Sequence, residues 1–259
     1  MPRFAANVSM LFTELPFEER FAAAAKVGFK AVEMLFPYDQ DPERIRKLLD
    51  EHALHLVLFN LCPGDLAAGE RGLACLPDRL QDFRRALDEG ARYVEVLRPD
   101  CVHLMAGYAP EDADPEEMDR VFVENVRLAA RTLAPFDAVV NLEAINQVSM
   151  PGFFLSTQSR SAHFVERIAE KNVGMQFDCF HCQMQEGNVG ARMKRYLPLI
   201  RHIQIAGAPD RHEPESGELR YEYLFPLMDA IGYKGYVGCE YNPANGTEAG
   251  LGWFAPWNM

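Results

Sequence analysis

The sequence has no long apolar run. Its 259 residues nowhere contain the roughly 18 consecutive apolar residues that a membrane-spanning helix needs. The N-terminal segment 1–10 also lacks the continuous apolar stretch of a secretory signal peptide. We therefore expect a cytoplasmic protein with no membrane partner.

Positive charge is scarce. Lysine and arginine total 26 against 38 aspartates and glutamates, so the formal net charge at pH 7 is −12, and no lysine and arginine run makes a basic stripe. A chain of this charge opposes the phosphate backbone, and we expect no nucleic-acid partner. The apolar share of 48% and the charged share of 25% are ordinary for a globular protein, which excludes disordered and fibrous classes.

Cysteine is sparse and scattered. Four of the six cysteines lie in or beside apolar runs, as reduced buried thiols often do. Only Cys179 and Cys182 have the CxxC spacing. A single pair of this kind is weak evidence for a zinc or redox site.

What the chain does have is a regular alternation of strand-like and helix-like segments, which predicts βα units around a parallel sheet. The predicted strands cover 4–10, 31–35, 54–60 and 101–106, and four later strands end at Glu143, end at Asp178, contain Gln204 and end at Glu240. The predicted helices cover 17–27, 42–51, 78–97, 115–133, 158–170, a segment from Asp178 to about residue 196, and 221–231.

Eight strands in 259 residues give a repeat typical of a (β/α)₈ TIM barrel. We predict a single α/β domain over residues 1–259. The long loops 61–77, 144–157 and 206–218 all follow strands, so they should lie on the catalytic face of such a barrel. The tail 241–259 has no strand partner, and we expect its aromatic side chains to cover the barrel mouth or to join a subunit contact in a homo-oligomer.

Oxygen-bearing side chains lie near the ends of four successive strands: Glu143, Asp178, Gln204 and Glu240. A carboxylate at the end of an apolar run must be paired, neutralised or bound to metal. Three carboxylates and one amide are ligands that suit Mg²⁺, or alternatively Mn²⁺. We predict a divalent metal site here, against two structural alternatives, an ion pair within the mouth and a core amide at Gln204.

Three further residues are candidates for substrate binding. His181 follows Asp178 by three positions and can bond a substrate oxygen or transfer a proton, unless it only has a local partner at a helix start. Arg211 carries a planar guanidinium that suits a carboxylate, although loop arginines are common. Glu70, in the first long loop, is a weaker candidate, as is His103.

Several short motifs follow one another in order: NVSMLF at 7–12, LFPY at 35–38, PGD at 63–65, AGERG at 68–72, NLE at 141–143, HIQIA at 202–206, GEL at 217–219 and VGCEY at 237–241. Together they resemble hydroxypyruvate isomerases and the closely similar 2-oxo-tetronate isomerases, which are xylose-isomerase-like barrels. The resemblance extends from Pro2 to about Trp257.

This resemblance implies a Mg²⁺-type site at the four strand-end residues, with Glu143 and Glu240 as proton donor and acceptor. The metal would chelate the C2 and C3 oxygens of a small 2-oxo acid and stabilise an enediolate. The implied reaction is the aldose–ketose isomerisation of hydroxypyruvate to tartronate semialdehyde (2-hydroxy-3-oxopropanoate).

Different segments of the chain resemble different branches of this family. The loop 207–214 looks more like the four-carbon branch, whereas 144–146 and 150–153 look more like the three-carbon branch. The same chemistry on 2-oxo-tetronate is therefore the alternative, and a ketose 3-epimerase is a further one.

The fold also hosts DNA-repair endonucleases and non-catalytic sugar-binding proteins, so fold alone does not decide function. A repair enzyme should have a positive surface and a histidine-rich multi-zinc site, whereas this chain has a charge of −12 and seven histidines. A pure binder would not need two free carboxylates on one metal. We therefore expect an enzyme.

Overall fold

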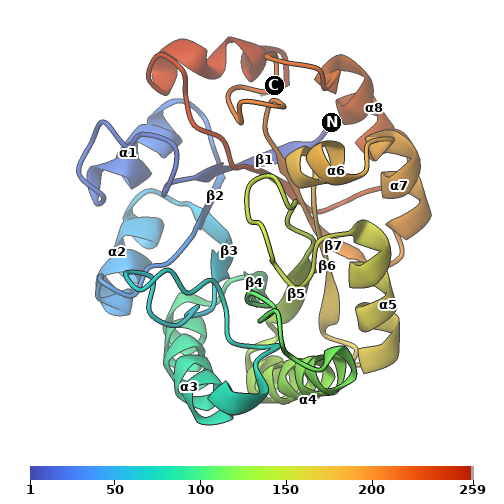
Figure 1. The fold of residues 1–259 in the computed structure, drawn as a ribbon. Helices are drawn as coiled ribbons and strands as arrows, with labels where there is room; N and C mark the ends of the chain where they lie inside the picture. Colours follow the sequence, from blue (N-terminus) through green and yellow to red (C-terminus); the bar gives the residue numbers. More distant parts are fainter. Residues whose placement is uncertain (258–259) are drawn as a thin grey trace.

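Eight parallel strands close into a barrel, each strand pairing with the next in chain order and β1 with β8 (Figure 1). The computed structural model describes residues 1–257. The strands are β1 (Arg3–Asn7), β2 (Ala31–Met34), β3 (His55–Asn60), β4 (Cys101–His103), β5 (Val139–Glu143), β6 (Val173–Asp178), β7 (Ile200–Ile205) and β8 (Tyr236–Cys239). The predicted TIM barrel is confirmed.

Helices surround the barrel on its outside (Figure 1). The α-helices are α1 (Glu19–Lys26), α2 (Pro42–Glu51), α3 (Leu80–Leu97), α4 (Pro115–Leu133), α5 (Gln158–Ile168), α6 (Cys179–Gln185), α7 (Val189–Tyr196) and α8 (Tyr221–Ala230). Short 3₁₀ turns are η1 (Pro77–Arg79), η2 (Ala134–Phe136), η3 (Glu248–Trp253) and η4 (Ala255–Trp257). None of the helices described within residues 1–257 is long and apolar enough to cross a membrane.

Some predicted boundaries are wrong. The single helix predicted from Asp178 to about residue 196 is two helices, because Gly187 and Asn188 adopt φ values of 66° and 55° that end one helix before the next begins. The first strand stops at Asn7 rather than at residue 10, since the N–H groups of Met10 and Leu11 bond back to the Asn7 carbonyl in a turn.

The barrel interior changes character along its axis. Alternate residues of a strand face the same side, so positions i and i+2 share the interior. On three strands the buried interior side chain changes from small and apolar to polar over two positions: Ala5 to Asn7, Ala31 to Glu33 and Cys101 to His103. The carboxyl-terminal half of the interior is therefore polar, while the space between strands and helices holds the main apolar core.

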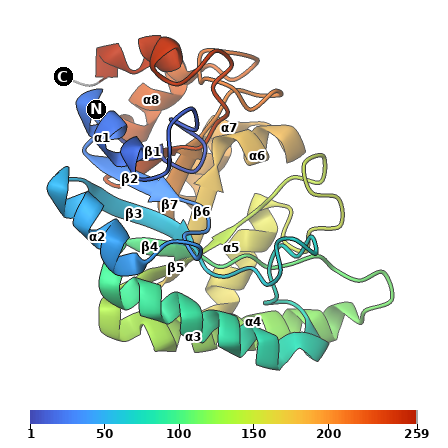
Figure 2. The same ribbon diagram turned by 90° about the vertical axis from the view of Figure 1, so that its left-hand side faces the viewer.

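The C-terminal tail first lies near the carboxyl ends of the strands and then packs on the outer side of the barrel. Near its start, Thr247 accepts a hydrogen bond from the backbone N–H of Phe12, close to the strand ends. Further on, Trp253 packs edge-to-face on Phe4 with ring centroids 5.1 Å apart, and Phe254 stacks on Phe29 at 4.3 Å. Figure 2 shows this part beside α1 and α8, on the outer wall of the barrel. A subunit contact stays a prediction, and residues 258–259 lie outside the described part.

Candidate active site at the carboxyl ends of the strands

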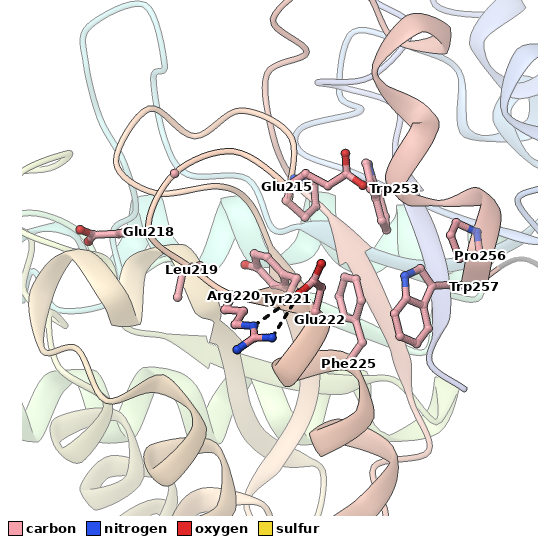
Figure 3. A pocket seen from close by; sticks show the side chains of 12 residues that line it. Glu215, Glu218, Leu219, Arg220, Tyr221, Glu222, Phe225, Trp253, Pro256 and Trp257 are labelled. Atoms are coloured by element: carbon pink, nitrogen blue, oxygen red, sulfur yellow. Dashed lines mark hydrogen bonds and ion pairs between the residues drawn. The ribbon is translucent and has the colours of Figure 1, made fainter.

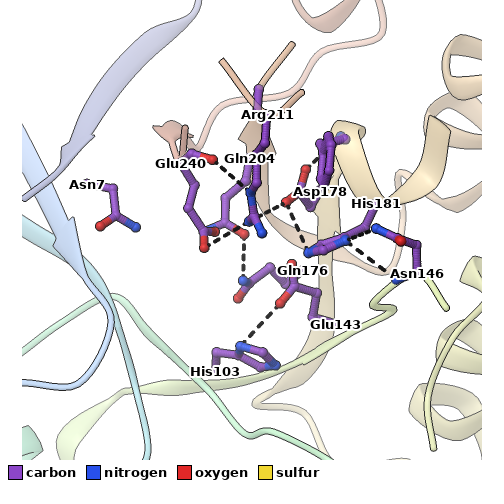
Figure 4. Close-up of polar contacts among 12 residues, drawn as sticks. Asn7, His103, Glu143, Asn146, Gln176, Asp178, His181, Gln204, Arg211 and Glu240 are labelled. Carbon is purple, nitrogen blue, oxygen red and sulfur yellow. Dashed lines mark hydrogen bonds and ion pairs between the residues drawn. The ribbon is translucent and has the colours of Figure 1, made fainter. Parts of the chain in front are cut away.

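The register of the last four strands gathers the predicted strand-end residues (Figure 4). Asp178 pairs with Gln204 across β6 and β7, and Gln204 pairs with Gly238 across β7 and β8, two residues before Glu240. Glu143 ends β5 and pairs with Gln176 of β6. All four side chains therefore lie at the carboxyl-terminal end of the barrel, where TIM-barrel enzymes have their active sites.

Glu143, Asp178 and His181 form a tight buried cluster. One ligand atom from each lies within 4.8 Å of the others. Glu143 Oε2 is 3.3 Å from His103 Nδ1, while its Oε1 is buried without a hydrogen-bond partner. A buried polar atom without a partner costs roughly 1–3 kcal/mol, and more when the group is charged. The orphaned oxygen indicates a position prepared for a ligand.

Arg211 connects Glu240 to this cluster. One terminal guanidinium nitrogen lies 3.0 Å from Glu240 Oε1 and 3.4 Å from Asp178 Oδ2. Its Nε donates to the Glu240 backbone carbonyl at 3.3 Å, and the group lies 5.0 Å from the centre of the Phe180 ring. The positive φ of Arg211, 56°, belongs to the loop conformation that turns this side chain inward.

Burial dominates the proton affinities of the three acids. It raises the pKa of Glu240 to about 8, although the Arg211 charge opposes the shift. Burial, then the charges of Glu240 and Asp178, raises the pKa of Glu143 well above its usual range. Burial also raises the pKa of Asp178 against the effect of Arg211. Holding all three ionised near neutral pH therefore requires more positive charge than Arg211 supplies.

Arg211 itself stays a cation. Burial alone would lower the pKa of its guanidinium, but the negative charges of Glu240 and Asp178 raise it overall. Arg211 is thus a fixed countercharge between two of the acids.

The hydrogen bonds of His181 define its tautomer. Asn146 Oδ1 accepts from the Ser149 N–H at 2.7 Å, which leaves Asn146 Nδ2 to donate to His181 Nδ1 at 2.6 Å. Burial lowers the pKa of His181 well below its usual value, so the ring is neutral and carries its hydrogen on Nε2. That Nε2–H faces Asp178 Oδ2 at 3.7 Å. In this arrangement His181 therefore presents a hydrogen-bond donor toward Asp178.

Gln204 is held at both ends of its amide. Its Oε1 accepts from Gln176 Nε2 at 2.6 Å, and its Nε2 donates to Glu33 Oε1 at 2.9 Å. Glu33 also accepts from Asn7 Nδ2 at 3.1 Å and lies 2.7 Å from His202 Nε2. Gln204 is thus joined to a polar layer beneath the acids, and its Oε1 is the end of the amide directed away from Glu33.

A cavity of about 380 Å³ opens above these side chains, lined by Glu143, His181, Arg211 and Glu240 among others. This volume is at the lower end of the range for small-molecule sites. Asp178 and Gln204 lie deeper and do not line it. Four of the seven predicted site residues therefore line the cavity. Asp178 lies beneath them, bonded to Arg211, and Gln204 lies beside Asp178 on β7. Glu70 is the seventh.

Glu70 lies apart from this cavity. Its carboxylate pairs with Arg79 of η1 and accepts the Asp65 N–H at 2.6 Å, so both oxygens are engaged within the first long loop and η1. Its neighbour Arg71 lines the cavity instead. The prediction that Glu70 contacts substrate has no support in this arrangement.

A larger hollow of about 490 Å³ lies elsewhere, between the segment before α8 and the C-terminal tail (Figure 3). Its walls include Tyr221, Phe225 and Trp257, and the charged pair on its rim, Arg220 and Glu222, is exposed and 3.4 Å apart. It holds none of the buried acids, so size alone does not identify the active site.

Comparison with known proteins then identifies the family. The model of the xylose isomerase-like TIM barrel family matches residues 21–257. The chain belongs to this family. Family membership confirms the predicted resemblance and fold.

Relatives of this xylose isomerase-like chain extend over its whole length. A 2-oxo-tetronate isomerase of Cupriavidus necator is 49% identical over 257 residues, covering 99% of each chain. The hydroxypyruvate isomerase of Escherichia coli is 40% identical and covers 99% of this chain and 100% of its own. A crystal structure from Brucella melitensis, described as an AP endonuclease of family 2, is 46% identical with a TM-score of 0.97 over 99% of each chain. The prediction of an isomerase is confirmed.

Sequence reasoning missed several residues of this family member's site. Gln176 lies two positions before Asp178 and His202 two before Gln204, so strand alternation placed each on the same face as a predicted ligand. Glu33 gave a similar signal as a carboxylate within an apolar strand. Nothing in the sequence points to Asn146, which lies in a loop and acts through His181.

Proposed function

We propose that this chain is a divalent-metal-dependent isomerase that moves the carbonyl group of a small hydroxylated 2-oxo acid between C2 and C3. The observation that carries the proposal is the pair of buried glutamates on the cavity wall, Glu143 and Glu240, at the ends of β5 and β8. Their raised pKa values suit groups that exchange protons near neutral pH.

The two glutamates divide the proton transfers. One takes the proton from C3, and the electron pair of that C–H bond forms the C2–C3 double bond of an enediolate. The other delivers a proton to C2, while the C3 hydroxyl loses its proton and becomes the new carbonyl and the C2 oxygen takes up a proton and becomes the new hydroxyl. Two carboxyl groups with different surroundings support these opposite roles, because Glu143 lies beside neutral His103 whereas Glu240 is paired with Arg211.

The donor set fits a hard divalent cation such as Mg²⁺, with Mn²⁺ as the alternative. Glu143, Asp178, Gln204 and Glu240 would hold it through oxygen atoms, and the unpartnered Glu143 Oε1 is the observation that supports this assignment. When bound, such an ion supplies electrophilic stabilisation of negative charge on the substrate oxygens.

His181 orients the substrate in this proposal. Its Nε2–H is fixed by the bond from Asn146 to Nδ1, and a neutral imidazole donor suits an oxygen on which charge develops. Because the low pKa keeps the ring neutral, its role is to donate a hydrogen bond rather than a proton.

Two substrates are candidates within this class. The 49% identity to a protein named 2-oxo-tetronate isomerase favours the four-carbon acid, as does the loop 207–214. Hydroxypyruvate, the three-carbon acid, is the second candidate, supported by 40% identity to a hydroxypyruvate isomerase. Nucleic acid is disfavoured by the net charge of −12.

A parallel turnover assay tests the proposal. Purified protein loaded with Mg²⁺ is given 2-oxo-tetronate and hydroxypyruvate separately, and NMR follows the carbonyl carbon. We expect isomerisation of both, faster with the four-carbon acid, and loss of activity in EDTA. Absence of turnover with either acid, in protein shown to bind Mg²⁺, would refute the function.

A further inference from the structure

Two cations line the cavity within residues 1–257, Arg211 and Arg71. Any 2-oxo acid brings a carboxylate into a site that already holds three buried acids. A cation with free bonding capacity is therefore required, and the two arginines differ in that respect.

Arg211 is already engaged. Its guanidinium bonds to both Asp178 and Glu240, and also to the Glu240 backbone carbonyl. Moving it to a substrate carboxylate would remove the countercharge from two buried acids, which is strongly unfavourable.

Arg71 has bonding capacity to spare. Within the described residues its guanidinium donates to two neutral groups, the carbonyl oxygens of Glu70 at 2.7 Å and Leu66 at 3.4 Å, both from the same terminal nitrogen. A guanidinium has five N–H donors in a planar fork that matches a carboxylate. The side chain is half-buried on the cavity wall.

The loop around Arg71 is anchored on both sides. Before it, the Glu70 carboxylate bonds to Arg79 and to the Asp65 N–H. After it, Gly72 forms a bridge with Ala106, adopts a φ of 114°, and approaches the Met105 carbonyl so closely that a Cβ would overlap it. Glu70 thus acts on the site through its neighbour, as a positioning residue.

Arg71 also enters from the opposite wall. It follows β3, whereas Arg211 follows β7, and these strands are four apart in the closed ring of eight. In Figure 2 the loops after β3 and β5 extend on the same side of the barrel, which is the side of the strand ends. A small acid bound between the walls can direct its carboxylate to one side and its reacting carbons to the acids on the other.

We propose that Arg71 binds the substrate carboxylate, while Arg211 balances the charge of Asp178 and Glu240. This inference rests on the proposed function for its substrate class. It assigns specificity for an acid over a neutral sugar to the loop 61–77.

Steady-state kinetics of Arg71→Gln and Arg71→Lys test the assignment. Because the carboxylate bond exists in both ground and transition states, KM should rise roughly ten- to a hundredfold in Arg71→Gln with kcat within about threefold. Arg71→Lys should recover part of the loss. Arg84→Gln, on an exposed arginine of α3 that does not line the cavity, is the matched control and should leave both constants unchanged.

Calorimetry with D-glycerate, a carboxylate that lacks the reacting carbonyl, separates this inference from the function. Wild-type protein should bind glycerate but not glycerol, and Arg71→Gln should lose glycerate binding while keeping Mg²⁺ binding. Unchanged KM and glycerate affinity in Arg71→Gln would overturn the inference, with the function intact if the wild type still turns over. Wild-type protein that binds glycerate through Arg71 but isomerises neither acid would support the inference and refute the function.

Discussion

The barrel interior holds two layers of buried carboxylate that differ in how they are satisfied. In the lower layer, Glu33 is bonded by Asn7, Gln204 and His202 at 3.1, 2.9 and 2.7 Å. In the upper layer, Glu143 has one oxygen with no partner and shares its surroundings with two other acids. The same residue type is thus a structural element in one layer and a group left open for ligand in the other.

The lower layer is built around Glu33 on every side. Gly238 of β8 has no side chain, and a Cβ at this position would overlap the Glu33 carboxylate. The amide of Gln204 is oriented by its bond to Glu33, so the lower layer fixes a predicted ligand of the upper one. Both Glu33 and Glu143 are buried, so burial does not distinguish them, whereas the unpartnered oxygen of Glu143 does.

The largest expected effect comes from removing the upper acids. Glu143→Gln and Glu240→Gln keep an oxygen but lose the proton-transfer group, so kcat should fall by about 10²–10⁴ with the fold retained. Steady-state assays with circular dichroism check this, and Glu222→Gln on the exposed surface is the control. A near-normal kcat in both variants would show that Glu143 and Glu240 do not transfer protons, which would leave them a role as metal ligands only.

The free energy of unfolding should depend on the lower acid, Glu33, more than on the upper acid, Glu143. Glu33→Gln replaces one carboxylate oxygen, which accepts hydrogen bonds, with an amide NH₂ group, which donates them. Because Asn7, His202 and Gln204 all bond to this carboxylate, the variant should be destabilised by about 3 kcal/mol or more. Glu143→Gln should be neutral or stabilising in metal-free protein at pH 8, because burial opposes ionisation of that carboxyl. Urea unfolding of both variants measures the contrast. Equal losses would remove the distinction between the layers.

The sequence predicts one layer better than the other, for physical reasons. Asp178 and Glu143 stand out because each ends an apolar strand, and Gln204 follows from the same pattern. Glu33 also stands out as a carboxylate within an apolar strand, but its structural role does not follow from the sequence, since its partners His202 and Gln204 lie 169 and 171 residues away and only the closed barrel brings them near.

Loop side chains are harder still to predict. The order of Glu70 and Arg71 along the chain gives no indication of which one faces the cavity, because loop backbone has no fixed side-chain period. The break between α6 and α7 likewise depends on the positive φ of Asn188, which a helical pattern does not reveal.

A smaller effect is expected from pH in the metal-free protein. The folded pKa of Glu240, about 8, lies above the ordinary value of 4.5, so the stabilisation present at low pH is lost as pH rises toward 8. Neutral His103 and His181 act in the other direction only below about pH 6.5, where unfolded histidine takes up protons.

Between pH 6.5 and 8 the free energy of unfolding should therefore fall by about 1–2 kcal/mol through Glu240 alone, and further through Glu143. Urea titrations across this range measure it. Glu240→Gln should reduce the dependence and leave the part that Glu143 contributes, and saturating Mg²⁺ should abolish it in the wild type. A stability that rises with pH in the metal-free wild type would show that these acids are ionised in the fold.

Deuterium incorporation tests the central claim most directly, namely that one upper glutamate removes the C3 proton and the other delivers a proton to C2. With the reaction run in D₂O, the carboxyl group that protonates C2 has exchanged its hydrogen with solvent, so the product should carry deuterium at C2. Product incubated alone in D₂O corrects for uncatalysed exchange. A hydride shift from carbon to carbon would leave C2 unlabelled, and product without deuterium above that control would contradict the account.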